Sequence, residues 1–335
     1  MSRDAAIAAF LAEAGLGGAP RAPLAGDASA RRYERVAGRV LMDAPPGSGE
    51  DVRPFLDLAA TLARAGLSVP RIEAADPAAG LVLMEDLGDA LLARHAAARP
   101  EAEAEAYVAA VETAHAMQAA PVAGRPDYAE AMPELAALAV DWYAPEAAGA
   151  RGALRAAVAG AVAALGPARV LVHRDYHAEN LLWLPDRAGA ARVGVLDFQD
   201  AAAGPVDYDV ASLVNDARRA VAPAARDAAL ARWAALTGRD ADAVARGVAV
   251  CSAQRNLRIL GVFARLSLRD GKARYPDFIP RTWTLLQADL AHPALAEVAA
   301  VAREALPAPT PARLDDLRAR AGTVGPEGPA AGPAR

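Results

Sequence analysis

The residues best suited to chemistry lie in one short segment near the middle of the chain, His173-Arg174-Asp175-Tyr176-His177-Ala178-Glu179-Asn180. This segment fits the pattern H-R-D-L-x-x-x-N at four of its five fixed positions, with Tyr176 in place of leucine. Asp197 follows Asn180 by seventeen residues, at the end of an apolar run. Phosphoryl transfer needs a carboxylate beside the attacking hydroxyl and oxygen ligands for a metal ion on the phosphates. We therefore predict that Asp175 is the catalytic residue and that Asn180 and Asp197 bind Mg²⁺.

The segments around these residues predict how the chain brings them together. The runs LLWL (residues 181–184) and RVGVLDF (192–198) flank a turn at residues 185–191, which predicts a β-hairpin. Such a hairpin returns the chain so that Asn180 and Asp197 can face one cation. An alternative is that Asp175 and Asn180 only cap turns and Asp197 only ends a strand. The joint occurrence of these residues at the pattern's spacing favours the catalytic interpretation.

The rest of the chain predicts an α+β fold class with two lobes. A cap helix at residues 2–14 precedes strands at 33–36 and 39–42, a helix at 50–66, and strands at 71–74 and 81–84. These make a small β-rich N-lobe, residues 1–89, with a hinge at 84–89. Residues 90–306 are mainly helical and make a larger C-lobe that contains the catalytic-loop hairpin and the acceptor site. Residues 307–335 are rich in Pro, Ala and Gly, which predicts a flexible tail with room for a helical turn or more at 311–321.

Composition excludes several classes of protein. With 335 residues and 54% hydrophobic content, the chain can bury a large core. A net charge of −5 argues against nucleic acid as the main partner, because binding phosphates needs a basic face. The single cysteine, Cys251, cannot form an internal disulfide or a cysteine-rich zinc site. Arg3, Asp4 and Glu13 interrupt the apolar positions of the N-terminus, so we expect no cleavable signal peptide there, and we find no uncharged run long enough to cross a bilayer. We therefore expect a cytoplasmic monomer without membrane insertion.

These motifs resemble the aminoglycoside phosphotransferase and choline kinase superfamily, small-molecule relatives of protein kinases. Several further stretches are similar to bacterial anomeric kinases of the amino sugars used in cell-wall recycling. They are GDASARRY (26–33), VLMDAPP (40–46), MEDLGD (84–89), HRDYHAENLLWLP (173–185), LDFQDAAAGPVDYDVASLVNDARR (196–219) and RNLRILGVFARLSLRDGKARY (255–275). The resemblance covers about residues 6–302.

The resemblance implies a protein-kinase-like fold with ATP and Mg²⁺ as cofactors. It also implies an activity, the phosphorylation of N-acetylmuramate and/or N-acetylglucosamine at the anomeric hydroxyl to the 1-phosphate in peptidoglycan recycling. The expected partners are thus ATP and a small-molecule amino sugar.

The resemblance further implies a nucleotide site in the N-lobe. The turn formed by Gly26, Asp27 and Ser29 would lie over the phosphates, and the hinge residues Met84, Glu85 and Leu87 would bind adenine. Taken alone, Gly26-Asp27 is equally well an ordinary hairpin turn.

One departure from the wider pattern concerns the phosphate-binding lysine. A lysine is expected near residues 40–44, which read VLMDA, and the chain's only lysine, Lys272, follows the catalytic hairpin. Arg31 or Arg32 could supply the missing charge, since arginine binds phosphate bidentately. The alternative is that both arginines are surface residues.

The acceptor site is less defined by sequence. The apolar helix at 248–268 is interrupted by polar residues, of which Gln254 and Arg258 share a face. They could hold sugar hydroxyls or a lactyl carboxylate, or they could satisfy buried loop carbonyls. The candidate acceptor-binding residues are His177, Asn215, Gln254, Asn256 and Arg258. Asp207 and Asp209 are expected to stabilise the catalytic loop or to cap the next helix.

Two competing functions remain open at this point. The first is a kinase for another small alcohol, such as choline, homoserine or an aminoglycoside, although only 5% of residues are aromatic and cationic acceptors need an acidic or aromatic cage. The second is a nucleotide-binding pseudokinase, which the missing strand lysine supports. Against it, the predicted base and metal positions are all filled.

Overall fold

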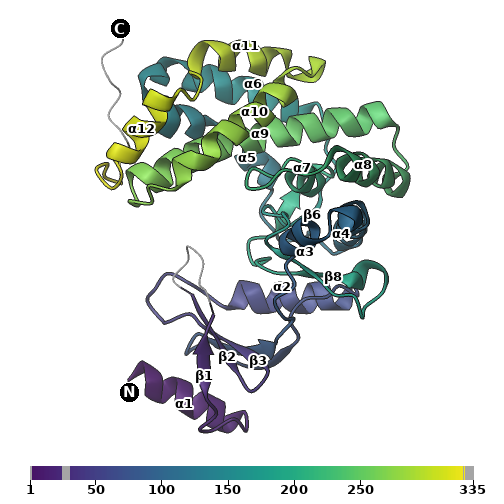
Figure 1. Cartoon of the computed structure of the whole chain (residues 1–335), viewed down its shortest axis with the longest axis vertical. Helices are drawn as coiled ribbons and strands as arrows, with labels where there is room; N and C mark the ends of the chain where they lie inside the picture. Colours follow the sequence, from purple (N-terminus) through teal and green to yellow (C-terminus); the bar gives the residue numbers. More distant parts are fainter. Residues whose placement is uncertain (1, 25–30, 327, 329–335) are drawn as a thin grey trace. The chain divides into compact units, whose positions relative to one another are not determined.

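The computed structural model describes residues 2–24, 31–326 and 328, and the chain divides into two compact units (Figure 1). The first unit contains residues 1–120 and 178–201, and the second contains residues 121–177 and 202–335. The catalytic-loop hairpin thus groups with the β-rich part of the chain, as does the segment 90–120. The lobe boundaries proposed from the sequence stay a prediction.

The first unit is built on a five-stranded antiparallel sheet with the order β1-β2-β3-β5-β4. Its strands are β1 (Arg21–Pro23), β2 (Arg32–Val36), β3 (Arg39–Asp43), β4 (Ile72–Asp76) and β5 (Leu81–Glu85). Ala37 and Gly38 join β2 to β3 with φ values of +47° and +74°, the geometry of a tight hairpin turn. Sequence reasoning missed β1, a three-residue edge strand that includes Pro23.

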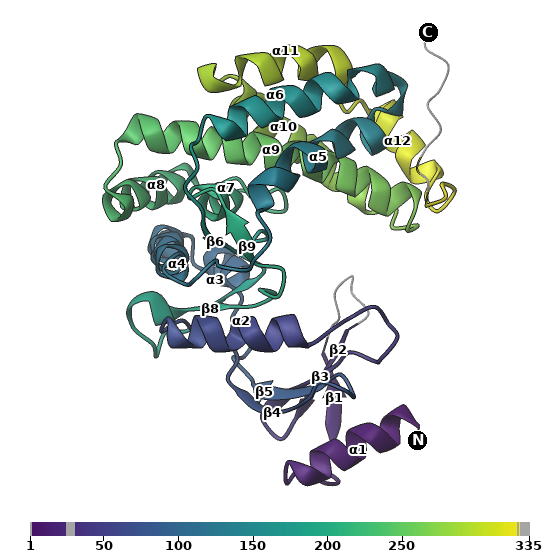
Figure 2. The same cartoon turned by 180° about the vertical axis from the view of Figure 1, so that it is seen from behind.

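Two helices cover the faces of this sheet, α1 (Arg3–Glu13) and α2 (Arg53–Arg64). Ile7, Phe10 and Leu11 of α1 pack in one apolar cluster with strand residues that include Leu41 and Leu83. Side chains alternate between the two faces of a strand, so Met42, Val82 and Met84, which are also buried, point the other way. Figure 2 shows α2 on that opposite side of the sheet.

The predicted hairpin is present as β7 (Leu181–Trp183) and β8 (Val193–Val195), which pair with Leu181 opposite Val195. It is anchored on the first unit by two contacts outside the sheet. The Val195 N–H donates to the Ser68 carbonyl over 2.8 Å, and the Thr113 hydroxyl donates to the Ala190 carbonyl over 2.9 Å. Thr113 belongs to α4 (Glu103–Met117), which follows α3 (Leu92–Ala98). The hairpin therefore has a fixed place on this unit.

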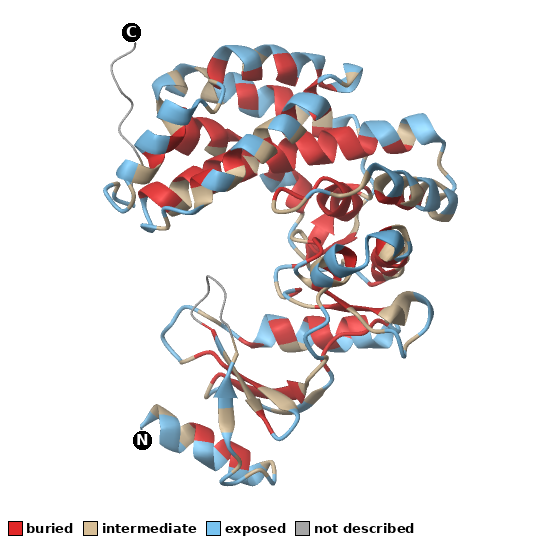
Figure 3. Cartoon of the chain, in the orientation of Figure 1, coloured by how far each residue is buried: buried red, intermediate tan, exposed pale blue. Residues whose placement is uncertain are grey.

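The second unit is mainly helical and is organised around α9 (Ala241–Leu268), which is buried along most of its length (Figure 3). A Cβ on Gly261 would lie 2.2 Å from the Leu138 carbonyl oxygen, so only glycine lets the end of α5 approach this closely. Two short strands, β6 (Val170–Val172) and β9 (Ala202–Gly204), pair with each other, a pairing that sequence reasoning missed. The other helices are α5 (Tyr128–Leu138), α6 (Arg151–Ala163), α7 (Tyr208–Val214), α8 (Pro223–Thr237), α10 (Ile279–Leu290) and α11 (Ala296–Ala305).

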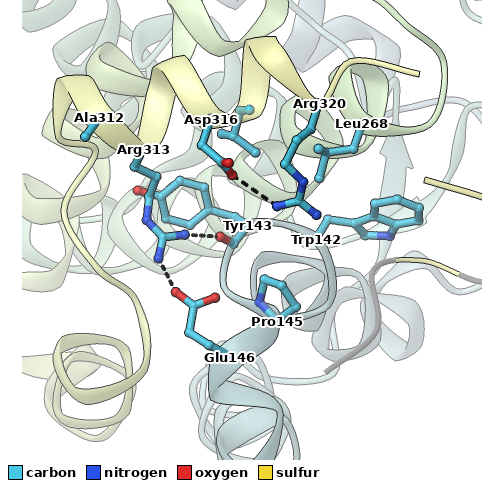
Figure 4. A pocket seen from close by; sticks show the side chains of 10 residues that line it. Trp142, Tyr143, Pro145, Glu146, Leu268, Ala312, Arg313, Asp316 and Arg320 are labelled. Atoms are coloured by element: carbon cyan, nitrogen blue, oxygen red, sulfur yellow. Dashed lines mark hydrogen bonds and ion pairs between the residues drawn. The ribbon is translucent and has the colours of Figure 1, made fainter. Parts of the chain in front are cut away.

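The end of the chain contains a helix where the sequence allowed a helical turn or more, at residues 311–321. Within the region predicted as a flexible tail, residues Pro311–Ala319 form the helix α12. Arg313 of this helix donates to the Tyr143 carbonyl over 2.7 Å and pairs with Glu146, as Figure 4 shows, while the Tyr143 hydroxyl donates to the Pro307 carbonyl over 2.8 Å. These distant contacts hold α12 and the residues before it against the Tyr143 region. Within the described ranges, the helices include none with the length and apolarity needed to span a bilayer.

Candidate active site

The catalytic loop begins directly after β6 and contains a residue in a strained conformation. Arg174 has φ +75°, in the left-handed region that residues other than glycine rarely adopt. Asp209, in the first turn of α7 and fully buried, holds this bend by accepting the N–H groups of His173 (2.7 Å) and Arg174 (3.1 Å). Burial raises the pKa of Asp209 to about 6, although the charge of His173 and these two N–H groups oppose the rise. Asp209 thus stabilises the loop, as the sequence predicted.

The Asp175 carboxylate contacts two basic side chains, one at each oxygen. Arg255 Nη2 lies 3.2 Å from Oδ1, and His177 Nε2 lies 3.3 Å from Oδ2. Partial burial favours the neutral form, but the hydrogen bond and charge of His177, with Arg255 and Arg218, outweigh it and hold the pKa of Asp175 well below its usual value. The side chain keeps 41% of its surface exposed. It is therefore ionised, held in one orientation and partly exposed.

His177 has two neighbours that compete for one nitrogen. Arg218 Nη1 lies 2.8 Å from the same Nε2 atom that faces Asp175. Arginine can only donate, so Nε2 either accepts from Arg218 or, when protonated, donates to Asp175. A single Nε2 cannot make both hydrogen bonds at once, so its protonation decides which of the two neighbours it binds.

Arg218 and Arg255 are site residues that sequence reasoning missed. Arg255 stands between Gln254 and Asn256 in the polar run of α9, and nothing in the spacing marks it as the residue that contacts Asp175. Arg218 lies near the end of the family-like stretch 196–219, but sequence reasoning assigned it no role.

The two predicted metal ligands lie at the same end of the β7–β8 hairpin. The Leu196 N–H donates to the Asn180 carbonyl over 3.0 Å, so Leu196 lies across from Asn180 and Asp197 is the next residue along the chain. Asp197 is exposed, has φ +58°, and accepts a 2.7 Å hydrogen bond from Gln199 Nε2. The next residue, Phe198, is fully buried and stacks on Phe55 of α2 at 4.9 Å between ring centroids. This packing fixes the backbone that carries Asp197.

The donor set at this hairpin end fits Mg²⁺. A carboxylate and an amide oxygen are hard ligands, and Mg²⁺ is commonly bound by one or two carboxylates with water and phosphate oxygens as the remaining ligands. Among the residues that the structure describes, no group of three or more His, Cys, Asp or Glu side chains could hold a metal ion. A two-residue oxygen site suits a cation that arrives with a nucleotide.

Of the two arginines considered for the missing lysine, Arg31 is the one in a structured environment. Its side chain is 7% exposed and its Nε lies 3.0 Å from Glu50, just before α2, whereas Arg32 is exposed. The pKa of the neighbouring Tyr33 is raised, mainly by burial. The charge and hydrogen bond of Arg31 act against this rise, and the charges of Asp197 and Glu50 add to it. Arg31 and Asp197 are therefore both near Tyr33.

The remaining predicted nucleotide residues are only partly placed. Gly26, Asp27 and Ser29 lie outside the described residues. Met84 is buried in β5, Leu87 is half-buried, and Glu85 pairs with Arg187 at 2.7 Å.

The predicted acceptor residues separate into two groups. Gln254 Nε2 donates to the Met132 carbonyl over 2.8 Å, so it binds a buried backbone carbonyl, although this carbonyl lies in helix α5 and not in a loop. Asn215 and Asn256 belong to a buried polar cluster with Ser252 and Asp289, in which Asn215 Nδ2 donates to Ser252 over 2.9 Å and Asn256 Nδ2 donates to Asp289 over 2.9 Å. By contrast, His177 contacts Asp175, and Arg258 is close enough for its charge to act on Asp175.

A separate pocket of about 380 Å³ lies beside α12 (Figure 4). Its lining includes Trp142, Tyr143, Leu268 and Leu317, and none of the predicted site residues. It takes no part in the chemistry described above.

This architecture defines a phosphotransferase with a protein-kinase-like fold. Its parts are a small antiparallel sheet covered by helices, a catalytic-loop hairpin and a helical second unit. The profile of the phosphotransferase enzyme family matches residues 21–247, and the chain belongs to this family. The fold class and superfamily predicted from the sequence are therefore confirmed, and the chain is a kinase that uses a nucleotide as phosphate donor.

Curated relatives refine this placement. The chain is 39% identical to the N-acetylmuramate/N-acetylglucosamine kinase of Caulobacter vibrioides, over 89% of this chain and 95% of that protein. It is 38% identical to the Pseudomonas aeruginosa protein of the same name, over 86% of this chain and 90% of that protein.

Solved structures agree on the fold. A choline/ethanolamine kinase family protein from Mesorhizobium loti superposes with a TM-score of 0.61 at 18% identity, over 90% of this chain and 100% of that chain. An aminoglycoside phosphotransferase in complex with GDP and kanamycin superposes with a TM-score of 0.59 at 18% identity, over 87% of this chain and 99% of that chain.

Proposed function

We propose that this chain transfers the γ-phosphoryl group of ATP to the anomeric hydroxyl of N-acetylmuramate or N-acetylglucosamine, giving the 1-phosphate and ADP in peptidoglycan recycling. The single observation that carries the acceptor is the 39% identity, over nearly the whole length of both chains, to a kinase named for these two sugars. The ionised, oriented Asp175 supports the reaction type. We infer a cytoplasmic monomer as the working form.

In this proposal Asp175 orients the sugar hydroxyl and accepts its proton as the hydroxyl oxygen attacks the γ-phosphorus. A carboxylate with a low pKa is a weak base, which suits a loose transition state in which the proton leaves late. Arg255 and His177 hold the carboxylate in place, and Asp209 holds the loop that carries it. The chemistry supplied by Mg²⁺, with Asn180 and Asp197 as its protein ligands, is neutralisation of phosphate charge.

We propose Arg31 as the replacement for the missing lysine. In protein kinases the strand lysine pairs with a glutamate of the adjacent helix and contacts the nucleotide phosphates. The Arg31–Glu50 ion pair of 3.0 Å has the same chemistry, and Arg31 shares the neighbour Tyr33 with Asp197. Gly26, Asp27, Ser29, Met84, Glu85 and Leu87 stay predicted nucleotide-binding residues.

The test is an acceptor screen that measures ADP release with each amino sugar, choline, homoserine and an aminoglycoside. We expect turnover with the amino sugars, abolished by a chelator and restored by Mg²⁺. Asp175→Asn should lower kcat by about a hundredfold or more, the order expected for loss of a general base, with an unchanged melting temperature. Comparable turnover by wild type and variant would remove the role of Asp175.

The screen also separates the alternatives. Turnover of choline, homoserine or an aminoglycoside in place of the amino sugars would replace the proposed acceptor. Binding of ATP and Mg²⁺ without any product would identify a pseudokinase.

A further inference from the structure

Arg255 is a buried cation whose hydrogen-bonding groups are mostly unused. The side chain is 3% exposed, and only its Nη2 atom contacts Asp175, over 3.2 Å. Its Nε and Nη1 atoms are buried and have no hydrogen-bond partner among the described residues. Burying unpaired donors of a charged group is unfavourable, so such groups are normally satisfied by protein, water or a ligand.

Arg258 stands three residues further along α9, on the same side of the helix as Arg255. Its Nη1 contacts the Tyr128 hydroxyl over 3.3 Å, and that hydroxyl lies 2.9 Å from the Tyr208 hydroxyl. The tyrosine hydroxyls and the charge of Asp175 outweigh burial and raise the pKa of Arg258, which stays a full cation. One guanidinium group therefore contacts the Asp175 carboxylate and a second acts on it by its charge, so two cations stand against one carboxylate in this part of the second unit.

We propose that Arg255 and Arg258 bind an anionic substituent of the acceptor, so that the preferred acceptor is an amino sugar carrying a carboxylate. This inference rests on the proposed function and narrows its acceptor class. A carboxylate matches the planar guanidinium fork, which can donate two parallel hydrogen bonds to it. The transferred phosphoryl group also carries oxyanions that arginine could bind. The experiment must therefore distinguish an arginine that binds the acceptor carboxylate from one that binds the phosphoryl group.

The experiment compares kcat/KM for three acceptors, N-acetylmuramate, its neutral methyl ester and the neutral N-acetylglucosamine. Wild type should use the free acid about tenfold better than the ester or more, as expected for a hydrogen-bonded charge pair. Arg258→Gln and Arg255→Gln should bring this ratio close to one. Arg246→Gln removes an exposed arginine of the same helix and should keep the wild-type ratio.

Each other outcome overturns the inference. A loss of the same size for all three acceptors would show that the arginines serve the transferred phosphoryl group. Equal use of acid and ester by wild type would refute an anion site while leaving the proposed function intact. Failure to phosphorylate any of the amino sugars would instead overturn the proposed function itself, and this inference with it.

A second measurement does not depend on variants that fold. Titrating wild type with N-acetylmuramate should raise its melting temperature more than the methyl ester does at equal concentration. Equal shifts would contradict the proposal even if Arg255→Gln, a substitution at a buried site, failed to fold.

Discussion

The buried carboxyl of Asp289 offers a sharp test of the physics of the second unit. This α10 residue is 8% exposed, and its Oδ2 atom accepts hydrogen bonds from Ser252 Oγ over 2.6 Å and from Asn256 Nδ2 over 2.9 Å. In Asp289→Asn the amide oxygen can accept both hydrogen bonds, and the side chain cannot ionise. The variant therefore imitates the protonated carboxyl at every pH.

The expected magnitude follows from the pKa of Asp289, which burial raises from 3.8 to about 7 against the opposing hydrogen bonds and the charge of Arg226. A raised carboxyl pKa means that the fold favours the protonated form. Its stabilisation is complete below the unfolded pKa and is lost as the pH rises through the folded pKa. A shift of about 3 pH units, at about 1.4 kcal/mol each, sets a ceiling of about 4 kcal/mol.

Urea unfolding of both proteins at pH values from about 5 to about 8 measures this directly. The free energy of unfolding of Asp289→Asn minus that of wild type should rise by about 1.4 kcal/mol per pH unit up to about pH 7 and then level off. Asp242→Asn, which removes an exposed carboxylate in the first turn of α9, should keep the wild-type pH profile. Parallel pH profiles for wild type and Asp289→Asn, or a variant less stable than wild type at high pH, would refute the reasoning.

Two further predictions test packing and nucleotide binding. Gly261→Ala should lower the free energy of unfolding by about 1–3 kcal/mol, because its Cβ would lie 2.2 Å from the Leu138 carbonyl oxygen. Gly160→Ala in α6, where no atom lies within 4 Å of the added Cβ, should raise the free energy of unfolding by about 0.5–1 kcal/mol. Urea unfolding measures both variants, and equal effects would contradict the close contact at Gly261. Arg31→Met should raise KM for ATP about tenfold, and more than Arg32→Met does, because of these two arginines Arg31 is the one that is buried and paired with Glu50. Steady-state kinetics measure both variants. The reverse order of the two KM values would assign the missing lysine's role to Arg32.

Much of the candidate site is predictable because its residues are close in the sequence. The spacing from His173 to Asn180 and the two apolar runs before and after residues 185–191 predict a catalytic loop and a hairpin. The register of this hairpin, with Leu181 opposite Val195, is seen in the structure. In the same way, Ala37-Gly38 between two β-prone runs predicts the β2–β3 turn. Local patterns of this kind need no knowledge of distant contacts.

Only the tertiary structure decides which distant side chains meet. Arg255 contacts Asp175 across 80 residues of sequence, while Gln254 beside it turns to the Met132 carbonyl. Neighbouring residues on a helix point in directions about 100° apart, so their roles depend on what packs against each face. The pairing of β6 with β9 and the contact of Arg313 with the Tyr143 carbonyl are likewise long-range. Their stabilising contacts form only when the chain has folded, and no local pattern records them.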